Sequence, residues 1–214
     1  MAAKTFWDRV ARRYIANPVS DVAAYQRKLD LTRAWLTPDT EVLEIGAGSG
    51  ATARQHAPYV RHIDCIDYSA GMVAHQRAEA EKAGLTNITV TQSSLSDWPQ
   101  DRRYDVILAM SVLHLLPDRR AGLARIGAML RPGGVFVSST ACLGAVSPLR
   151  PLIALPSALG LLPRVGFFGV EVLLAEMRDA GLTVVSQWQP KARAAHFIVA
   201  RKPGQGAAVA HSGA

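Results

Sequence analysis

Cysteine is scarce in this sequence, and its scarcity excludes several classes of protein. Among 214 residues there are only two, Cys65 and Cys142, and both lie in apolar surroundings. Two such cysteines supply neither a disulfide framework nor the paired spacing of a metal site. The histidines at positions 56, 62, 75, 196 and 211 show no metal-site spacing either. We expect no metal ion, and two buried thiols in a reducing, cytoplasmic compartment.

Long hydrophobic runs are also missing. The amino-terminal stretch 1–18 has charges throughout and no apolar segment of signal-peptide length. The longest strongly apolar, uncharged run lies at 151–163, and it is too short and too rich in proline to span a bilayer. The sequence therefore predicts a protein that is neither secreted nor embedded in a membrane.

Positive charge is in excess, but no run of it occurs. The formal net charge is +7, and the lysines and arginines are dispersed along the chain. Such a charge suits a nucleic acid, an anionic membrane or an acidic substrate, and its dispersal favours none of them. With 49% hydrophobic and 19% charged residues, the composition is typical of one globular domain.

Short apolar runs alternate with amphipathic stretches through most of the chain. Helical patterns are found at 5–15, 21–36, from 50 onward, 69–83, 118–130 and 169–180. Strand-like runs are found at 40–46, 62–67, 87–92, 104–110, 135–140, 182–189 and 194–202. This alternation predicts an α/β fold whose mostly parallel sheet is covered on both faces, with ligands at the carboxyl ends of its strands.

The stretch EVLEIGAGSG, residues 41–50, ends the first of these strands in alternating glycines. Gly46, Gly48 and Gly50 permit positive φ angles and remove the Cβ atoms that would hold a ligand away from the backbone. The helix expected from Gly50 directs its free N–H groups toward that loop, which favours an anionic group there. The spacing differs from the G-x-G-x-x-G of dinucleotide-binding proteins, and the Gly-Lys-Ser/Thr ending of a P-loop is missing.

Four segments occur in a fixed order around this loop. VLEIGAGSG is followed by IDCIDYSAGMV, in which Asp67 lies 17 residues after Gly50, and then by YDVILAMSVLHLLPD and IGAMLRPGGVFV. Together they resemble the motifs of the class I S-adenosylmethionine-dependent methyltransferases over about residues 40–140, and more loosely to the carboxyl terminus. The resemblance implies a Rossmann-like, doubly wound sheet of seven strands, with the last strand antiparallel and S-adenosyl-L-methionine as cofactor.

The resemblance also implies roles for particular side chains. Asp67 would accept hydrogen bonds from the ribose diol, since an ionised carboxylate offers only acceptors. Glu44 would face the ammonium of the methionine moiety, directly or through water. The cofactor backbone would lie against the loop, at positions Gly46, Ala47, Gly48 and Gly50.

The adenine end departs from the pattern of the family. Tyr68 and Met72 would cover the ribose and adenine, and Met110 ends the fourth strand beside the expected site. Relatives often have Gly-Asp and a small apolar residue after the third strand, where the Asp receives the adenine amino group. This chain has Ser94 and Leu95 at the corresponding positions. A hydroxyl accepts more weakly than a carboxylate, so adenine contacts would depend more on Leu95 and the backbone.

Methyl transfer from a sulfonium needs an aligned acceptor and the exclusion of water more than it needs catalytic residues. A hydroxyl acceptor requires a general base, whereas an amine need only be neutral, and a carboxylate or thiolate is already nucleophilic. His114, just beyond the fourth strand in SVLHLLPD, is the candidate base. A histidine with apolar neighbours is also a common structural residue, and the sequence leaves both roles open.

The segment after the fourth strand disfavours nucleic acid as the substrate. Enzymes that methylate exocyclic base amines have Asn/Asp-Pro-Pro-aromatic there, and cytosine C5 enzymes use Pro-Cys, whereas this chain has Ala-Met-Ser-Val at 109–112. The sequence also lacks aromatics interleaved with a basic stripe, which would indicate RNA binding. The acids and asparagine of the metal-dependent catechol enzymes do not follow this strand. A small-molecule acceptor is therefore favoured.

Two regions outside these motifs are expected to select the acceptor. Residues 1–36 are predicted to form an N-terminal helical lid, in which Tyr14, Tyr25 and Lys28 approach the methionine end of the cofactor or the acceptor. The alternative, that the aromatics only pack the helices onto the sheet, stays open. The methyltransferase domain is expected at 37–202. Within it, the apolar segment 141–168 would line an acceptor pocket, contact a membrane or form a dimer, and the tail 203–214 is expected to be disordered.

The combined prediction is methylation of an oxygen or nitrogen atom in a small, apolar or amphiphilic acceptor, by in-line displacement. Three alternatives stay open: a phospholipid-amine N-methyltransferase at the membrane surface, a cofactor-binding protein without methylation activity, and a nicotinamide-dependent oxidoreductase. Peripheral membrane contact is compatible with the sequence, as are a monomer and a homodimer.

Overall fold

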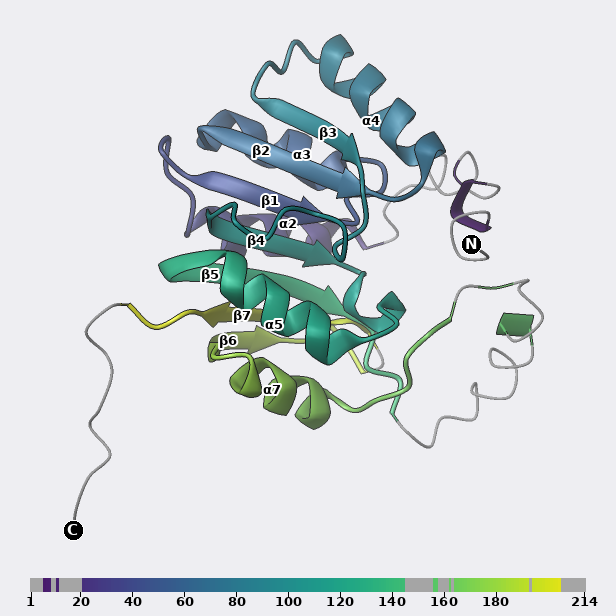
Figure 1. The fold of residues 1–214 in the computed structure, drawn as a ribbon, viewed down its shortest axis with the longest axis vertical. Helices are drawn as coiled ribbons and strands as arrows, with labels where there is room; N and C mark the ends of the chain where they lie inside the picture. Colours follow the sequence, from purple (N-terminus) through teal and green to yellow (C-terminus); the bar gives the residue numbers. More distant parts are fainter. Residues whose placement is uncertain are drawn as a thin grey trace.

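A seven-stranded sheet forms the centre of the molecule in a computed structural model that describes residues 6–8, 11, 21–144, 156–157, 162, 164–192 and 194–204. The strands lie in the order β3-β2-β1-β4-β5-β7-β6 (Figure 1). They are β1 (Glu41–Ile45), β2 (His62–Asp67), β3 (Ile88–Gln92), β4 (Tyr104–Met110), β5 (Leu130–Thr140), β6 (Thr183–Trp188) and β7 (His196–Arg201). Strand β7 runs opposite to the other six, so its pairings with β5 and β6 are antiparallel and all other pairings are parallel. The predicted doubly wound sheet with an antiparallel last strand is confirmed.

Helices cover both faces of the sheet. They are α2 (Val22–Arg33), α3 (Ala51–His56), α4 (Ala70–Lys82), α5 (Arg119–Met129) and α7 (Val170–Asp179), with the short turns η1 (Ala57–Tyr59) and η2 (Leu113–Leu115). One apolar layer joins α5 and α7 to Phe136 and Ile107 of the sheet, and a second joins α2, α3 and α4 to Val42 and Val106 (Figure 1). Burying a valine, isoleucine or phenylalanine side chain contributes about 1.5–3 kcal/mol to the stability of the fold. Both faces are therefore occupied by packing, and the carboxyl edge is where a ligand has room.

Strand β5 begins earlier than the sequence predicts. The sequence indicates a Pro-Gly-Gly turn before residue 135, but the strand already starts at Leu130 and pairs with β4 through a register shift. Gly134 makes this irregular pairing feasible, because an added Cβ would lie 2.9 Å from the carbonyl oxygen of Arg131 and 3.0 Å from that of Asp105. The glycine allows the strand to bulge where a side chain would force a turn.

Side chains fix the starts of three helices. Asp21, Ser69 and Asp118 each accept a hydrogen bond from the backbone N–H three residues later, at 3.0, 3.4 and 2.9 Å. An N-cap of this kind contributes about 1 kcal/mol. At the other end of α4, Gly84 has a φ of 67°, the left-handed conformation expected of a glycine there. These caps set where α4 and α5 begin, which is at the carboxyl edge of the sheet.

The thiols differ from each other in burial. Cys65 is buried as expected, whereas Cys142 is only partly buried.

Within the described ranges, no group of three or more His, Cys, Asp or Glu side chains is placed to hold a metal ion. No helix in this part of the chain combines the length and the apolar character needed to cross a membrane.

Candidate active site

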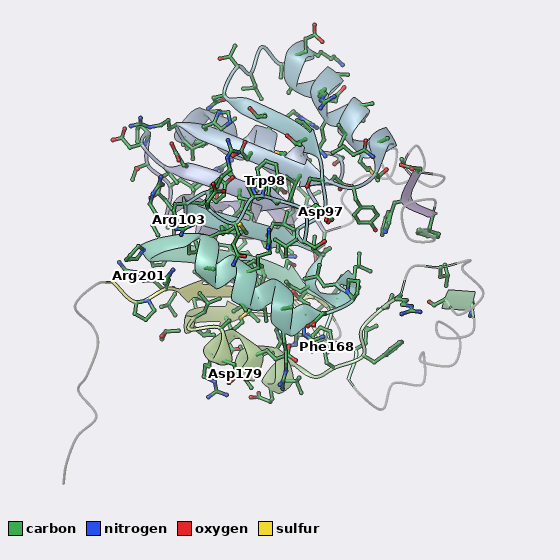
Figure 2. The ribbon with its side chains drawn as sticks, in the orientation of Figure 1. Asp97, Trp98, Arg103, Phe168, Asp179 and Arg201 are labelled. Carbon is green, nitrogen blue, oxygen red and sulfur yellow. The ribbon has the colours of Figure 1, made fainter. Side chains whose placement is uncertain are left out.

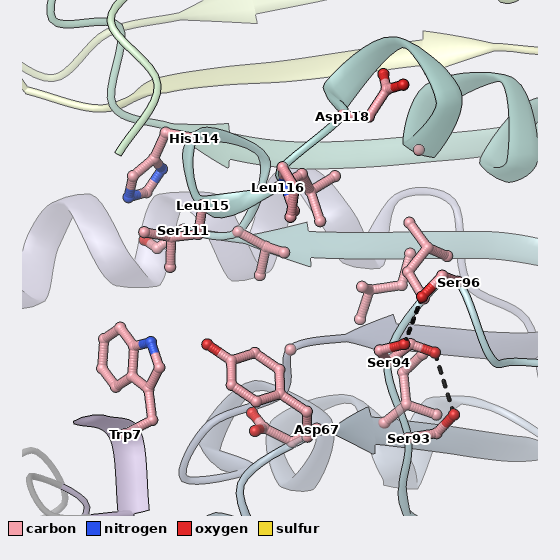
Figure 3. Close-up of a pocket in the computed structure, with 18 of the residues that line it drawn as sticks. Trp7, Asp67, Ser93, Ser94, Ser96, Ser111, His114, Leu115, Leu116 and Asp118 are labelled. Atoms are coloured by element: carbon pink, nitrogen blue, oxygen red, sulfur yellow. Dashed lines mark hydrogen bonds between the residues drawn. The ribbon is translucent and has the colours of Figure 1, made fainter. Parts of the chain in front are cut away.

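A cavity of about 1220 Å³ opens at the carboxyl edge of the sheet (Figure 3). Its wall comprises the segments that follow β1, β2, β3 and β4, part of α5, the amino-terminal residues Phe6 and Trp7, and Leu162 and Val165. Pockets for one small molecule have volumes of about 300–1,000 Å³. The cavity therefore has room for two small molecules side by side.

The loop after β1 lets a ligand approach the backbone closely. Gly46, Gly48 and Gly50 have φ angles of 59°, 55° and 70°, in the left-handed region that favours glycine. A Cβ on Gly46 would lie 2.6 Å from Cγ2 of Val112, so a larger residue would displace that side chain. Behind the loop, buried Gln76 donates a hydrogen bond from Nε2 to the carbonyl oxygen of Gly48 at 2.8 Å. No pattern in the sequence indicated this support from α4.

Three residues predicted at this loop lie outside the cavity wall. Gly46 and Gly48 line the cavity, whereas Glu44, Ala47 and Gly50 do not. Glu44 is 2% exposed, and its Oε2 has no hydrogen-bond partner. Burial raises the pKa of Glu44 to about 8. At neutral pH this carboxyl group therefore holds a proton unless a cation is brought near it.

Asp67 joins the loop after β1 to the end of β2. Its Oδ2 accepts a hydrogen bond from the N–H of Gly48 at 3.0 Å, and its Oδ1 accepts one from the N–H of Ser69 at 2.9 Å. Burial raises its pKa from the ordinary value, although the side chain is part of the cavity wall. Each carboxylate oxygen has a further lone pair, so Asp67 can accept additional hydrogen bonds from a ligand.

The wall beyond Asp67 is formed by residues predicted for the adenine end. Tyr68, Met72, Ser94, Leu95 and Met110 all line the cavity. Met72 is 2% exposed and Leu95 is 6% exposed, so both present an apolar surface that is firmly packed. Burial raises the pKa of Tyr68 to about 12, and its hydroxyl therefore stays protonated.

A buried network fixes the loop between β3 and β4. Trp98 donates a hydrogen bond from Nε1 to the hydroxyl of Tyr104 at 3.1 Å, and that hydroxyl donates to Oδ2 of Asp64 at 2.8 Å. Arg102 donates a second hydrogen bond to the same oxygen at 2.7 Å. Figure 2 labels two residues of this loop, Asp97 near the tips of the strands and Arg103 near the opposite edge of the sheet. No sequence pattern predicts this network, and the one sign of it is the acid Asp64 inside the buried strand HIDCID.

His114 lies on η2 and lines the cavity. Burial lowers its pKa, so the imidazole is neutral at physiological pH, and its Nδ1 is buried without a partner. Trp7 lies opposite His114 across the cavity (Figure 3). Close by, Ser111 has a φ of 62°, which makes it the one described residue other than glycine with a positive φ. Such strain is often found at functional sites, and no sequence pattern indicated it.

The aromatic and basic residues predicted on the second helix do not reach the cavity. Lys28 instead donates a hydrogen bond from Nζ to Oγ of Ser139 at 2.9 Å, and burial lowers its pKa. Burial raises the pKa of Tyr25, whose hydroxyl points into the protein. Neither residue belongs to the cavity wall. Tyr14 lies outside the described residues.

The amino-terminal residues are attached to the start of α4. Oδ1 of Asp8 accepts a hydrogen bond from the hydroxyl of Ser69 at 2.6 Å and one from the N–H of Gly71 at 3.4 Å. Figure 1 shows this segment beside the amino-terminal end of α4. A carboxylate is stabilised there by the helix dipole. This attachment holds Trp7 at the cavity wall.

Backbone hydrogen bonds are formed near both ends of the apolar segment 141–168, which follows β5. The N–H of Gly144 donates to the carbonyl oxygen of Phe168 at 2.9 Å, and the N–H of Gly166 donates to that of His114 at 2.7 Å. The guanidinium of Arg119 lies 3.5 Å from the ring centre of Phe168. The end of the segment is therefore hydrogen-bonded to η2, the turn that contains His114.

Residues 42–134 match the family model of a methyltransferase domain. A ubiquinone biosynthesis O-methyltransferase of Bradyrhizobium sp. (strain ORS 278) is 27% identical, over 64% of this chain and 57% of that protein. The protein of the same name from Nitrobacter winogradskyi is 32% identical, over 58% and 47%. Residues 42–134 are therefore similar to methyltransferase domains. This chain spans about half the length of the curated relatives that it matches.

Solved structures of methyltransferases and of a cyclase share the fold of this chain. The N-methyltransferase NodS from Bradyrhizobium japonicum, in complex with S-adenosyl-L-homocysteine, superposes with a TM-score of 0.67 at 20% identity, covering 94% of this chain and 99% of that chain. The [4+2]-cyclase SpnF superposes with a TM-score of 0.77 at 17% identity, covering 94% and 95%. These likenesses show the fold, and S-adenosylmethionine is the cofactor of the family.

Proposed function

We propose that this chain transfers the methyl group of S-adenosyl-L-methionine to an oxygen or nitrogen atom of a small, apolar or amphiphilic acceptor. The observation that supports this most is the single cavity that extends from Gly48 and Asp67 to His114 and Trp7. Cofactor and acceptor can share that space, which brings the two reacting groups together and excludes water.

The residues at the glycine loop fit the methionine and ribose parts of this cofactor. Gly46 and Gly48 have no Cβ to hold it away, and Asp67 has lone pairs left for the ribose diol. Beneath the loop, the orphaned oxygen of Glu44 suits the ammonium group, because a nearby cation favours the charged carboxylate. When bound, the cofactor supplies a sulfonium methyl group that is already activated for displacement.

The other predicted residues divide into two groups. Tyr68, Met72, Leu95 and Met110 are proposed to enclose the adenosine, since all four line the cavity. Ala47, Gly50, Tyr25 and Lys28 are proposed to act from behind the wall, by holding the loop and β5 in place. The residues 6–8 are proposed as part of a lid over the acceptor, attached through Asp8.

His114 is proposed as the general base for a hydroxyl acceptor. Its neutral imidazole faces the cavity, and it takes the proton of the acceptor hydroxyl while the acceptor oxygen bonds to the methyl carbon. The carbon–sulfur bond breaks with its electron pair going to sulfur, so charge is balanced. An amine acceptor that arrives neutral does not need this step.

The wall near His114 favours an acceptor with an apolar body. Trp7 lies opposite His114 across the cavity, and Leu115 and Val165 also belong to the wall. Leu115 follows His114 in the chain. Val165 precedes Gly166, whose N–H donates to the carbonyl oxygen of His114. Such surfaces bind by removing apolar area from water. The names of the relatives include an O-methyltransferase and an N-methyltransferase, which supports an oxygen or nitrogen acceptor.

Transfer of labelled methyl groups to a panel of phenols and aromatic amines tests this function. With a hydroxyl acceptor, His114→Ala is expected to lower kcat by about 10²–10⁴-fold, the usual contribution of a general base. The dissociation constant of S-adenosyl-L-homocysteine should not change, and His75→Ala, which lies outside the cavity wall, should retain full activity. Binding of the cofactor product without turnover on any acceptor would instead indicate a cofactor-binding protein.

The pH dependence gives a second check on His114. Burial places its pKa below the ordinary histidine value of 6.5, and only the neutral form accepts a proton. The rate with a hydroxyl acceptor should therefore be constant above pH 6.5 and fall as the pH drops through the lowered pKa. A pH profile of kcat measures this, and an unchanged profile in His114→Ala would assign the titration to another group.

A further inference from the structure

A buried ion pair joins the start of α5 to α7. Arg119 donates hydrogen bonds from Nε to Oε2 of Glu176 at 2.5 Å and from Nη2 to Oε1 at 2.8 Å. Both side chains are largely buried, with exposed fractions of 15% for Arg119 and 6% for Glu176. Two parallel bonds of this kind fix the plane of the guanidinium as well as its position. Both residues lie outside the cavity wall, so the pair acts on the site only through what it contacts.

The guanidinium of Arg119 packs against the end of the apolar segment 141–168. It lies 3.5 Å from the ring centre of Phe168. A Cβ added to Gly166 would lie 3.4 Å from Nη1 of Arg119 and 3.2 Å from Cε1 of Phe168, so the backbone of Gly166 rests directly on both groups. A planar guanidinium stacks on an aromatic ring, which the ammonium of a lysine does not do in the same way. The ion pair therefore holds Gly166 in place.

Gly166 transmits this constraint to the turn that contains His114. Its N–H donates a hydrogen bond to the carbonyl oxygen of His114 at 2.7 Å. Val165, the residue before Gly166, lines the same cavity as the imidazole. On the other side, the chain continues from η2 into α5, whose first residue is Arg119. One arginine thus fixes η2 from two directions, through Gly166 and through the start of α5.

We propose that Arg119 is a positioning residue for His114, and that Glu176 holds Arg119 in the orientation this requires. The consequence for catalysis rests on the proposed function, in which His114 is the general base. A general base acts only within hydrogen-bond reach of the proton that it takes. A displacement of about 1 Å can lower a rate by about a hundredfold.

Histidine NMR tests the link between Arg119 and His114 without any acceptor. Burial alone lowers the pKa of His114, so an imidazole that gains contact with water titrates closer to the ordinary value of 6.5. Arg119→Lys keeps the positive charge but loses the two parallel bonds and the stacking on Phe168. The pKa of His114 is expected to rise toward 6.5 in this variant. The spectrum of His114→Ala assigns the resonance.

Kinetics with a phenol as the hydroxyl acceptor measures the effect on the reaction. Arg119→Lys should lower kcat by about ten- to a hundredfold, because the base is displaced. The dissociation constant of S-adenosyl-L-homocysteine should stay at its wild-type value, since Arg119 and Glu176 lie outside the cavity wall.

Arg120→Lys is the matched control. Arg120 contacts the same acid at 3.4 Å, but its side chain is 73% exposed, and exposed pairs contribute little. Both kcat and the pKa of His114 should keep their wild-type values in this variant.

A double variant separates positioning from stability. Arg119→Met combined with Glu176→Leu replaces the buried charges with apolar side chains of similar size, which often leaves a fold as stable as before. Methionine is flexible and places no planar group on Phe168. The pKa of His114 should therefore rise and kcat should fall while the unfolding temperature stays near that of the wild type. This variant also covers the case that Arg119→Lys does not fold.

The outcomes distinguish this inference from the proposed function. An unchanged pKa of His114 in either folded variant overturns the role of Arg119. A raised pKa without a fall in kcat supports that role and contradicts His114 as the base. A wild type that methylates no phenol contradicts the hydroxyl acceptor, and the NMR titration then decides the role of Arg119 by itself.

Discussion

At the scale of single residues, two carboxyl groups of the site are in opposite situations. Asp67 accepts two backbone hydrogen bonds and still faces the cavity. Glu44 is buried behind the glycine loop with one oxygen unpartnered, and its pKa is raised to about 8. The first is prepared to accept donors from a ligand, whereas the second is mostly protonated at neutral pH, and a nearby cation favours its charged form.

Asp67→Asn is expected to weaken the binding of S-adenosyl-L-homocysteine by about ten- to a hundredfold, because an amide nitrogen then stands where a charged acceptor stood. Isothermal titration measures the change. Asp39→Asn, at an exposed residue that precedes β1 and lies outside the cavity wall, is the matched control and should bind normally. Wild-type affinity in Asp67→Asn would contradict the ribose role.

Glu44→Gln should stabilise the ligand-free protein while weakening cofactor binding. The folded pKa of Glu44 lies above the ordinary 4.5, so its protonated form is favoured by folding and stability is lost as the pH rises from 4.5 to about 8. At pH 7 the glutamine removes a cost of about 2–3 kcal/mol. Urea unfolding at pH 5 and pH 7 measures the change in the free energy of unfolding, with Glu81→Gln as an exposed control. Equal stabilisation at both pH values would refute the burial effect.

The identity of these residues could be predicted from the sequence, whereas their orientation could not. The spacing of Asp67 after the glycines predicts a place at the cavity, and Asp67 lies there. Tyr25 and Lys28 are polar and close to the motif in sequence, yet α2 directs them toward the sheet. Helical periodicity indicates which residues share a face, but it does not say which part of the fold that face meets.

At the scale of elements, the β3–β4 loop forms one end of the cavity and depends on hydrogen bonds beneath it. The chain from Trp98 through Tyr104 to Asp64 fixes the loop to the sheet. Burial is the main cause that raises the pKa of Tyr104 to about 12, with Asp64 adding to it. The hydroxyl therefore remains a donor over the whole physiological range.

Tyr104→Phe is expected to lower the free energy of unfolding by about 1–3 kcal/mol, because it leaves the buried Nε1 of Trp98 and an oxygen of Asp64 without this partner. Binding of S-adenosyl-L-homocysteine should weaken as well, since the loop loses its fixed position. Urea unfolding and isothermal titration measure the two effects. Tyr59→Phe, at a tyrosine that is 46% exposed, should change neither.

The order and direction of the elements could be predicted because each strand is a short apolar run with a clear boundary. β4 illustrates this, since its interior is apolar and fully buried. The start of β5 could not be predicted, because Pro-Gly-Gly is typical of a turn and only the pairing with β4 makes it a bulge. Sequence patterns describe local preference, and here a neighbouring strand overrides it.

At the scale of the whole molecule, one cavity brings together residues from the amino terminus, the sheet and the segment after β5. A ligand in the cavity would therefore touch parts of the chain that are distant in sequence. Binding to the folded state alone stabilises the fold by mass action.

S-adenosyl-L-homocysteine at a hundred times its dissociation constant is expected to stabilise the protein by about 2.7 kcal/mol. For a domain of this size that raises the unfolding temperature by about 5–10 °C. Differential scanning calorimetry measures the rise, and NADH serves as the control for a dinucleotide. A rise with NADH and none with S-adenosyl-L-homocysteine would favour the nicotinamide-dependent oxidoreductase.

Two backbone hydrogen bonds lie at the ends of the apolar segment after β5: the N–H of Gly144 donates to the carbonyl oxygen of Phe168, and the N–H of Gly166 donates to that of His114. Both hydrogen bonds join backbone atoms only, so they do not depend on which side chains lie between them in the sequence. Substitutions between them therefore leave both hydrogen bonds available, while those at Leu162 and Val165 change the cavity wall. We expect the range of molecules accepted by such proteins to diversify fastest there, while the handling of the methyl donor stays constant.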